Sequence, residues 1–109
     1  MTYAEINAMV GSIGLPYEYY QFPENTGQEP PFICWMTDGI DDLYADNVNY
    51  QTIARVIIEF YSDRKDFTNE LTIETVLTGA GLTYTKEEAY LDSEHMHETI
   101  YTMEVVING

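Results

Sequence analysis

The sequence predicts an α+β fold, with an antiparallel or mixed sheet of four to five strands and two helices packed on one face of it. Three observations lead to this prediction. Two segments repeat apolar residues with the period of a helix, and several others alternate with the period of a strand. Their order along the chain (helix, strands, helix, two strands) suits two packed layers. Because 109 residues suffice for one hydrophobic core, we expect a single domain over residues 1–109.

The first helix is predicted from its start signal and its apolar spacing. Thr2 followed by Glu5 forms a capping-box pattern. Gly14 and Pro16 should end the helix near residue 13, since glycine favours the left-handed C-terminal conformation and proline blocks continuation. The apolar positions expected to face the core are Ile6, Met9, Val10 and Ile13.

The next region, up to residue 49, contains two shorter predicted strands. Residues 17–22 should form a short strand at an edge of the sheet, and residues 32–37 a second one that the Asp38-Gly39 pair ends. Residues 40–49 lack a clear period and are predicted to form a loop. The pairing of residues 14–50 within the sheet stays open.

The strongest strand pattern covers residues 50–62 and is followed by a second helix. Asp66 occupies an N-cap position, and Gly79 and Gly81 should close the helix. Residues 82–91 and 97–107 alternate again and should form two antiparallel strands around a turn near 91–94. The long strand should direct Ala54, Val56, Ile58 and Phe60 to one face and Arg55, Ile57, Glu59 and Tyr61 to the other. The predicted apolar stripe of the second helix comprises Phe67, Leu71, Ile73, Val76, Leu77 and Ala80.

Charge excludes several classes of function. With 19 acidic and four basic residues, the net charge is 4 − 19 = −15. Affinity for nucleic acid and for anionic membranes comes largely from Lys and Arg, so we expect neither specific nucleic-acid binding nor membrane binding. No uncharged apolar run approaches the length of a membrane span. Cys34 is the only cysteine, which excludes an internal disulfide and indicates a small buried hydrophobe.

No pattern of an enzyme or of a cofactor site is present. No serine, cysteine or lysine sits in a motif that would activate a nucleophile, and the glycines at 79–81 follow a helix instead of opening one, as a phosphate loop would require. Carboxylates are abundant, but no pair lies in a local context expected to raise a pKa. We therefore expect no catalytic residue and no cofactor.

Two patterns could bind a metal ion, although neither fixes a ligand set. His95 and His97 would point to the same side of a strand and could share a metal with a carboxylate such as Glu94. The alternative is a pair of exposed histidines. The acidic segment 37–46 lacks the ligand offsets of an EF-hand loop, so a solvated loop is expected there.

Surplus aromatic residues and one basic pair indicate a candidate subunit interface. Residues 17–22 hold more aromatic side chains than one small core can bury, although scattered surface aromatics are an equal alternative. Arg64 and Lys65 could form local charge pairs with Asp63 or Asp66, or could meet carboxylates of a neighbouring subunit. The candidate interface residues are Tyr17, Tyr19, Tyr20, Phe22, Tyr44, Tyr61, Arg64 and Lys65.

Several strings resemble a known family. The segment LPYEYYQFPE and the extended PPFICW, the YADN before the long strand, the IEFYSDRKD junction, and Glu94 with Tyr101 in the last strand region are similar to the tail-terminator (tail completion) proteins of long-tailed phages and prophages of Gram-positive bacteria. The resemblance spans roughly residues 13–105 and rests on distributed pattern, since that family has no catalytic signature.

The resemblance implies a structural, non-enzymatic virion protein. Such a protein forms a ring, usually of six subunits, in the virion tail after assembly in the host cytoplasm. It caps the tail tube and offers the joining surface for the head, so the implied partners are other copies of itself, the tail tube protein and a head-completion protein. The alternatives are another head-tail joining or connector protein, or a small acidic binding module such as a DNA-mimicking inhibitor.

Overall fold

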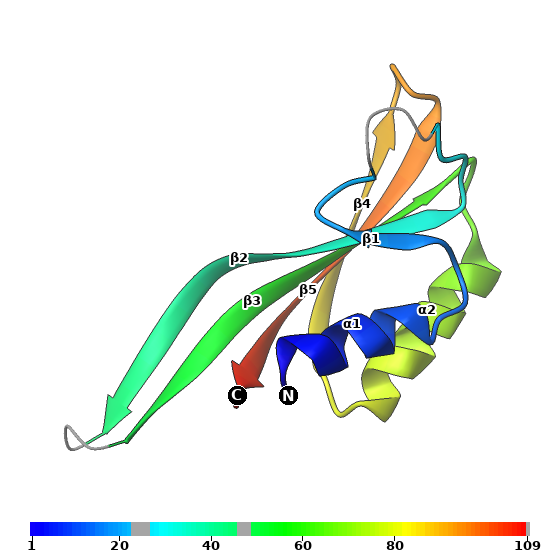
Figure 1. Cartoon of the computed structure of the whole chain (residues 1–109). Helices are drawn as coiled ribbons and strands as arrows, with labels where there is room; N and C mark the ends of the chain where they lie inside the picture. Colours follow the sequence, from blue (N-terminus) through cyan, green and yellow to red (C-terminus); the bar gives the residue numbers. More distant parts are fainter. Residues whose placement is uncertain (23–26, 46–48, 109) are drawn as a thin grey trace.

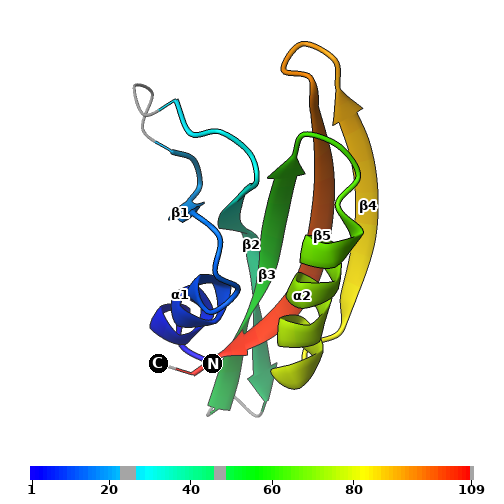
Figure 2. The same ribbon diagram turned by 90° about the vertical axis from the view of Figure 1, so that its right-hand side faces the viewer.

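The chain forms one mixed sheet with two helices on the same side of it (Figures 1 and 2). The computed structural model describes residues 1–22, 27–45 and 49–108, and the side chains of all of these except 39–45 and 49–51. Along the chain the elements are α1 (Tyr3–Gly11), β1 (Tyr17–Tyr19), β2 (Phe32–Ala45), β3 (Asn49–Ser62), α2 (Phe67–Gly79), β4 (Tyr84–Leu91) and β5 (Met96–Ile107). The predicted α+β class is confirmed.

The strands lie in the order β1-β2-β3-β5-β4. β1 pairs with β2 in parallel, and the other neighbours are antiparallel. β1 is a short edge strand, as predicted, but it ends at Tyr19 because Tyr20 has a φ of 71°, outside the extended region. The pairing of residues 14–50, which the sequence left open, is therefore settled for the described part of that segment.

The prediction that the second strand ends at residue 37 is wrong, and so is the predicted loop at residues 40–45 and 49; positions 46–48 of that loop lie outside the described residues. β2 continues to Ala45, with a shift of register between Thr37 and Ile40 that accommodates the Asp38-Gly39 pair as a bulge. β5 pairs with β3 only as far as Thr52, so the ends of β2 and β3 extend beyond the rest of the sheet as a two-stranded arm, at the lower left of Figure 1.

Both helix starts agree with the predicted signals. The Thr2 hydroxyl accepts a hydrogen bond from the Glu5 backbone N–H and the Glu5 carboxylate accepts one from the Thr2 N–H, which completes the capping box. The Asp66 carboxylate accepts from the Asn69 N–H at 3.0 Å and caps α2. Capping satisfies backbone donors that a helix start otherwise leaves unpaired.

The hydrophobic core lies between the helices and one face of the sheet. Ile6 and Val10 of α1 and Ile73 and Leu77 of α2 are fully buried against it. The predicted core face of β3 is confirmed, because its four apolar side chains are fully buried: Ala54, Val56, Ile58 and Phe60.

The predicted apolar stripe of α2 is wrong at its first turns. Phe67 and Leu71 are 73% and 66% exposed, whereas Glu70 is buried at 2% exposure.

Within the described residues, no helix has both the length and the apolar character needed to cross a membrane.

Candidate interaction site

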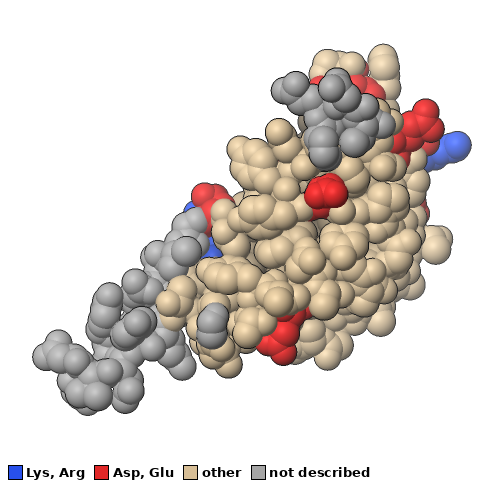
Figure 3. Space-filling view, in the orientation of Figure 1, with Lys and Arg blue, Asp and Glu red and all other residues tan. Residues whose placement is uncertain are grey.

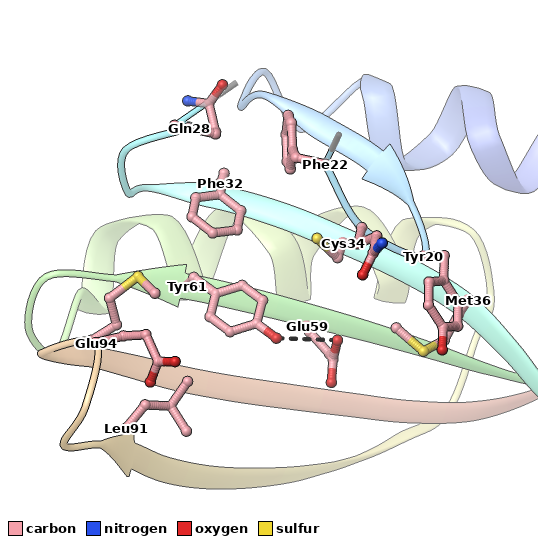
Figure 4. A pocket seen from close by; sticks show the side chains of 13 residues that line it. Tyr20, Phe22, Gln28, Phe32, Cys34, Met36, Glu59, Tyr61, Leu91 and Glu94 are labelled. Carbon is pink, nitrogen blue, oxygen red and sulfur yellow. Dashed lines mark hydrogen bonds between the residues drawn. The ribbon is translucent and has the colours of Figure 1, made fainter. Parts of the chain in front are cut away.

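The face of the sheet opposite the helices carries a hollow of about 820 Å³ (Figure 4). Strands β2 and β3, the segment after β1 and the β4–β5 turn contribute its walls. Because side chains alternate along a strand, every second residue of β3 leaves the core and points to this face. The lining residues are Tyr20, Gln21, Phe22, Gly27, Gln28, Phe32, Cys34, Met36, Glu59, Tyr61, Leu91, Glu94 and Met96.

Glu59 and Tyr61 line this hollow, and the carboxyl of Glu98 lies next to them on the same face of the sheet. The Tyr61 hydroxyl donates a hydrogen bond to Glu59 Oε1 at 3.2 Å. Glu98 is directly opposite Tyr61 in the β3–β5 register and is 8% exposed. Burial and the nearby negative charge of Glu98 raise the pKa of Glu59. The expectation that no carboxyl pair is placed to raise a pKa is therefore wrong for Glu59 and Glu98.

Aromatic side chains form one wall of the hollow. The ring of Phe32 stacks on that of Tyr61, with 4.9 Å between centroids. Phe22 meets Phe32 edge to face at 5.3 Å. Cys34 is buried beside them, as predicted, and burial raises the pKa of its thiol to about 11. The thiol is therefore protonated at neutral pH and adds no negative charge to the floor.

None of the described residues that line the hollow is basic. A buried carboxylate normally needs a cation or several hydrogen-bond donors, because desolvation disfavours its charge. Here the donor is one phenol, and the nearest ionisable neighbour of Glu59 is another carboxyl. The hollow therefore combines an apolar rim with an acidic floor that can accept a cationic group of suitable size.

On the helix side of the sheet, buried carboxylates have cations. Glu70 Oε1 accepts from Lys65 Nζ at 2.7 Å and lies 2.8 Å from Lys86 Nζ. Lys86 Nζ also reaches Glu74 Oε2 at 2.7 Å, and Lys65 Nζ also reaches Glu88. Burial alone would lower the pKa of Lys86, but its hydrogen bonds to Glu70 and Glu74 outweigh this and raise it. The lysines thus join α2 to β4.

Tyr101 and His97 extend this cluster along β5. The buried Tyr101 hydroxyl donates to Glu74 Oε2 at 2.8 Å, and His97 Nε2 lies 3.0 Å from Glu88 Oε1. Glu70, Glu88 and His97 come close enough to share a metal ion. Lys65 Nζ, however, contacts both carboxylates, so an ammonium already balances their charge. The predicted strand geometry for His95 and His97 is not formed, since His95 lies in the turn before β5 with a φ of 52°.

The two arginines have different surroundings. Arg55 donates to the backbone oxygen of Asp38 at 2.9 Å and to its carboxylate at 3.3 Å. Arg64 is exposed at the β3–α2 junction and makes no ion pair with any residue of the described part of the chain. Phe67 and Leu71 follow it on the exposed side of α2.

The structure gathers three of the predicted interface aromatics at the hollow and places Tyr17 and Tyr19 elsewhere. Tyr20, Phe22 and Tyr61 line the hollow. Tyr17 packs against the core, and Tyr19, although 49% exposed, packs edge to face on Trp35 at 4.7 Å.

The remaining three predicted residues also differ in their surroundings. The side chain of Tyr44 lies outside the described residues. Of the basic pair, Arg64 is exposed, whereas Lys65 pairs with Glu70 and Glu88 and not with Asp63 or Asp66.

Three carboxyls were not singled out from the sequence: the buried Glu70 and Glu98 and the partly exposed Glu59. The alternation of β3 places Glu59 and Tyr61 on the same face, so their proximity could have been found. Glu98 could have been added only with the β3–β5 register. The burial of Glu70 could have been predicted from its position, since it lies about one helical turn before Ile73, on the same face of the helix.

Comparisons with known proteins bear on the fold. No protein-family model matches the chain, and no curated protein matches it either. Among solved structures, the chain is similar to one from the virion of a native gene transfer agent particle, with a TM-score of 0.60 and 13% sequence identity. The similarity covers 97% of this chain and 86% of that one. At this identity the match establishes a shared fold over nearly the whole of both chains.

Proposed function

We propose that this protein is a structural component of a tailed, phage-like particle, and specifically a tail terminator. In this role it forms a ring, of six subunits, that caps the tail tube and presents the surface to which the head attaches. The observation that carries the proposal is the fold similarity to a chain of a gene transfer agent virion over nearly the whole length of both chains. The partners are other copies of this chain, the tube protein and a head-completion protein.

The shape of the chain supports a role in assembly. A two-stranded arm extends beyond the sheet, and the chain measures 51 × 29 × 22 Å along its principal axes. Such an arm can reach a neighbouring subunit without disturbing the core. The helix-free face, with its aromatic hollow, offers a second surface that a partner could cover.

Charge supports the same role. A ring through which DNA passes benefits from a negative wall, because phosphates then meet no cations that would hold them. The net charge of −15 provides this character. On the face in Figure 3, acidic residues are separated by uncharged surface among the described residues.

The test is the molar mass of the purified chain by light scattering on a sizing column. Salt and magnesium should be varied, because copies of net charge −15 repel one another unless their charges are screened. A hexamer would have a mass of 6 × 12.5 kDa, about 75 kDa. We expect monomers at low ionic strength and rings, visible by negative-stain electron microscopy, in salt or magnesium. A chain that remains monomeric and instead forms a 1:1 complex with a basic protein would contradict the proposal.

A further inference from the structure

The floor of the hollow is incomplete in the isolated chain. Glu98 is buried beside the partly exposed Glu59, and the Tyr61 hydroxyl donates a hydrogen bond to Glu59. Two carboxylates in such a place repel each other and lose hydration, and a cation between them offsets both costs. A guanidinium suits this position, because its planar fork of donors can reach two carboxylates at once.

One basic residue of this chain is available for that position. Within the described residues, Arg55 pairs with Asp38, and Lys65 and Lys86 are held in the helix-side cluster. Arg64 is exposed and has no ion-pair partner there. Among the described residues, therefore, the acidic hollow has no cation and Arg64 has no carboxylate partner.

The surroundings of Arg64 match those of the hollow. Phe67 and Leu71 are separated by one turn of α2, so their exposed side chains share one face of the helix that begins three residues after Arg64. Exposed large apolar side chains next to an unpaired arginine have the composition expected at the centre of a protein interface. The rim of the hollow offers matching apolar surface in Phe22, Phe32 and other residues.

We propose that the hollow on the helix-free face binds Arg64 of a second copy of this chain, with Phe67 and Leu71 of that copy packing on the rim. The guanidinium would lie between Glu59 and Glu98. This inference rests on the proposed function, because it assigns the residues that join neighbouring subunits of the ring.

The placement of the two surfaces determines the type of assembly. α2 lies on one side of the sheet and the hollow on the other, so one copy can use both surfaces at once, with two different neighbours. Contacts between two different surfaces of identical chains are head-to-tail, and they close into a ring when the rotation between subunits allows it. A symmetric dimer would need the same surface on both copies.

Two variants test the contact. Arg64→Glu removes the basic residue and leaves the hollow intact, whereas Glu59→Arg places the chain's own guanidinium in the hollow and leaves Arg64 intact. Under conditions in which the wild-type chain assembles, each variant alone should be monomeric. An equimolar mixture should give a dimer of 2 × 12.5 kDa, about 25 kDa, because only one functional contact can form in it. Glu59→Gln serves as a second hollow variant if Glu59→Arg does not fold.

The outcomes separate this inference from the proposed function. If Arg64→Glu assembles into rings as the wild-type chain does, the inference is overturned and the proposed ring stands. If each variant alone is monomeric and their equimolar mixture is monomeric as well, the proposed head-to-tail contact between Arg64 and the hollow is overturned.

A wild-type chain that is monomeric in every solution contradicts the proposed ring, and the contact is then tested directly. A benzophenone side chain is placed at Leu71 and irradiated at high protein concentration, and cross-linked peptides are identified by mass spectrometry. Cross-links to residues that line the hollow support the contact. Cross-links to α2 of the other copy, or the absence of cross-links between copies, overturn it.

Discussion

Carboxyl groups on the two sides of the sheet have opposite surroundings. On the helix side, Glu70 is almost completely buried and two lysines lie within 2.8 Å of one of its oxygens. On the other side, Glu59 and Glu98 lie beside each other, and no basic residue lines the hollow in the described part of the chain. The first group has its cations within one chain, whereas no basic residue among the described ones lines the second, and we propose that a neighbouring copy supplies a cation there. The comparison distinguishes charges that stabilise the fold from charges that await a contact.

The largest expected effect on stability comes from removing a lysine of the helix-side cluster. Lys86→Met removes the cation that pairs with Glu74 and one of the two that pair with Glu70, and it should lower the free energy of unfolding by about 3 kcal/mol, since it leaves Glu74 without a cation and Glu70 with Lys65 alone. Glu70 Oε2 already lacks a hydrogen-bond partner among the described residues, which makes further loss costly. Urea denaturation measures the change. The control is Arg55→Met, whose exposed pair with Asp38 should contribute less than about 1 kcal/mol.

A smaller loss is expected from Tyr101→Phe. This substitution removes the hydroxyl that donates to Glu74 and leaves the fully buried ring in place. Loss of such a hydrogen bond to a charged group should cost about 1 to 3 kcal/mol in urea denaturation. Tyr84→Phe is the matched control, since Tyr84 contacts the Tyr101 ring edge to face at 5.4 Å and should change little. Equal losses in both variants would show that the Tyr101 hydroxyl contributes nothing particular.

Stability should depend on pH with opposite signs on the two sides of the sheet, because the pKa of Glu59 in the hollow is raised and that of Glu88 in the helix-side cluster is lowered. The pKa of Glu59 is raised, so the folded chain binds a proton more tightly than the unfolded one, and this contribution to stability falls as pH rises above the ordinary value of 4.5. The pKa of Glu88 is lowered, by its hydrogen bonds to Lys65 first and to His97 second, so its contribution is lost as pH falls below 4.5. The two sides of the sheet therefore limit stability at opposite ends of the pH range.

Glu59→Gln isolates the contribution of the hollow. At pH 8 the isolated variant should have a higher free energy of unfolding than the wild-type chain. This gain should be smaller than the loss expected for Lys86→Met, and it should shrink toward pH 5 as Glu59 takes up its proton. Urea denaturation at several pH values measures this difference. A difference that does not vary with pH would show that Glu59 titrates in the folded chain as it does in the unfolded chain.

The fold could be predicted where a local period is strong. β3 alternates clearly, and its buried face was predicted residue by residue, as were the caps of both helices. The extension of β2 through residues 40–45 could not be predicted, because its backbone is paired by β3 and the sequence there has no strand period. The Asp38-Gly39 pair signals a turn locally, yet the sheet accommodates it as a bulge.

The candidate site was predictable only in part, for a related reason. Tyr61 and the aromatic segment 17–22 stand out in composition, but the site needs the β3–β5 register, which brings Glu98 beside Tyr61. Lys65 was a candidate interface residue by its position next to Arg64. The structure pairs it with Glu70 and Glu88, which are distant in sequence and come together only through α2 and β4.

The smallest effect on stability is expected for substitution of Arg64, in contrast to substitution of its neighbour Lys65. Arg64→Met should change the free energy of unfolding of the isolated chain by less than about 0.5 kcal/mol, because an exposed side chain without an ion pair among the described residues contributes little to the fold. Lys65→Met should cost more, since it removes a cation from Glu70. Urea denaturation at low ionic strength, where we expect monomers, compares the two variants. If both lose the same stability, Arg64 belongs to the fold, and the reason for assigning it to a neighbouring subunit is removed.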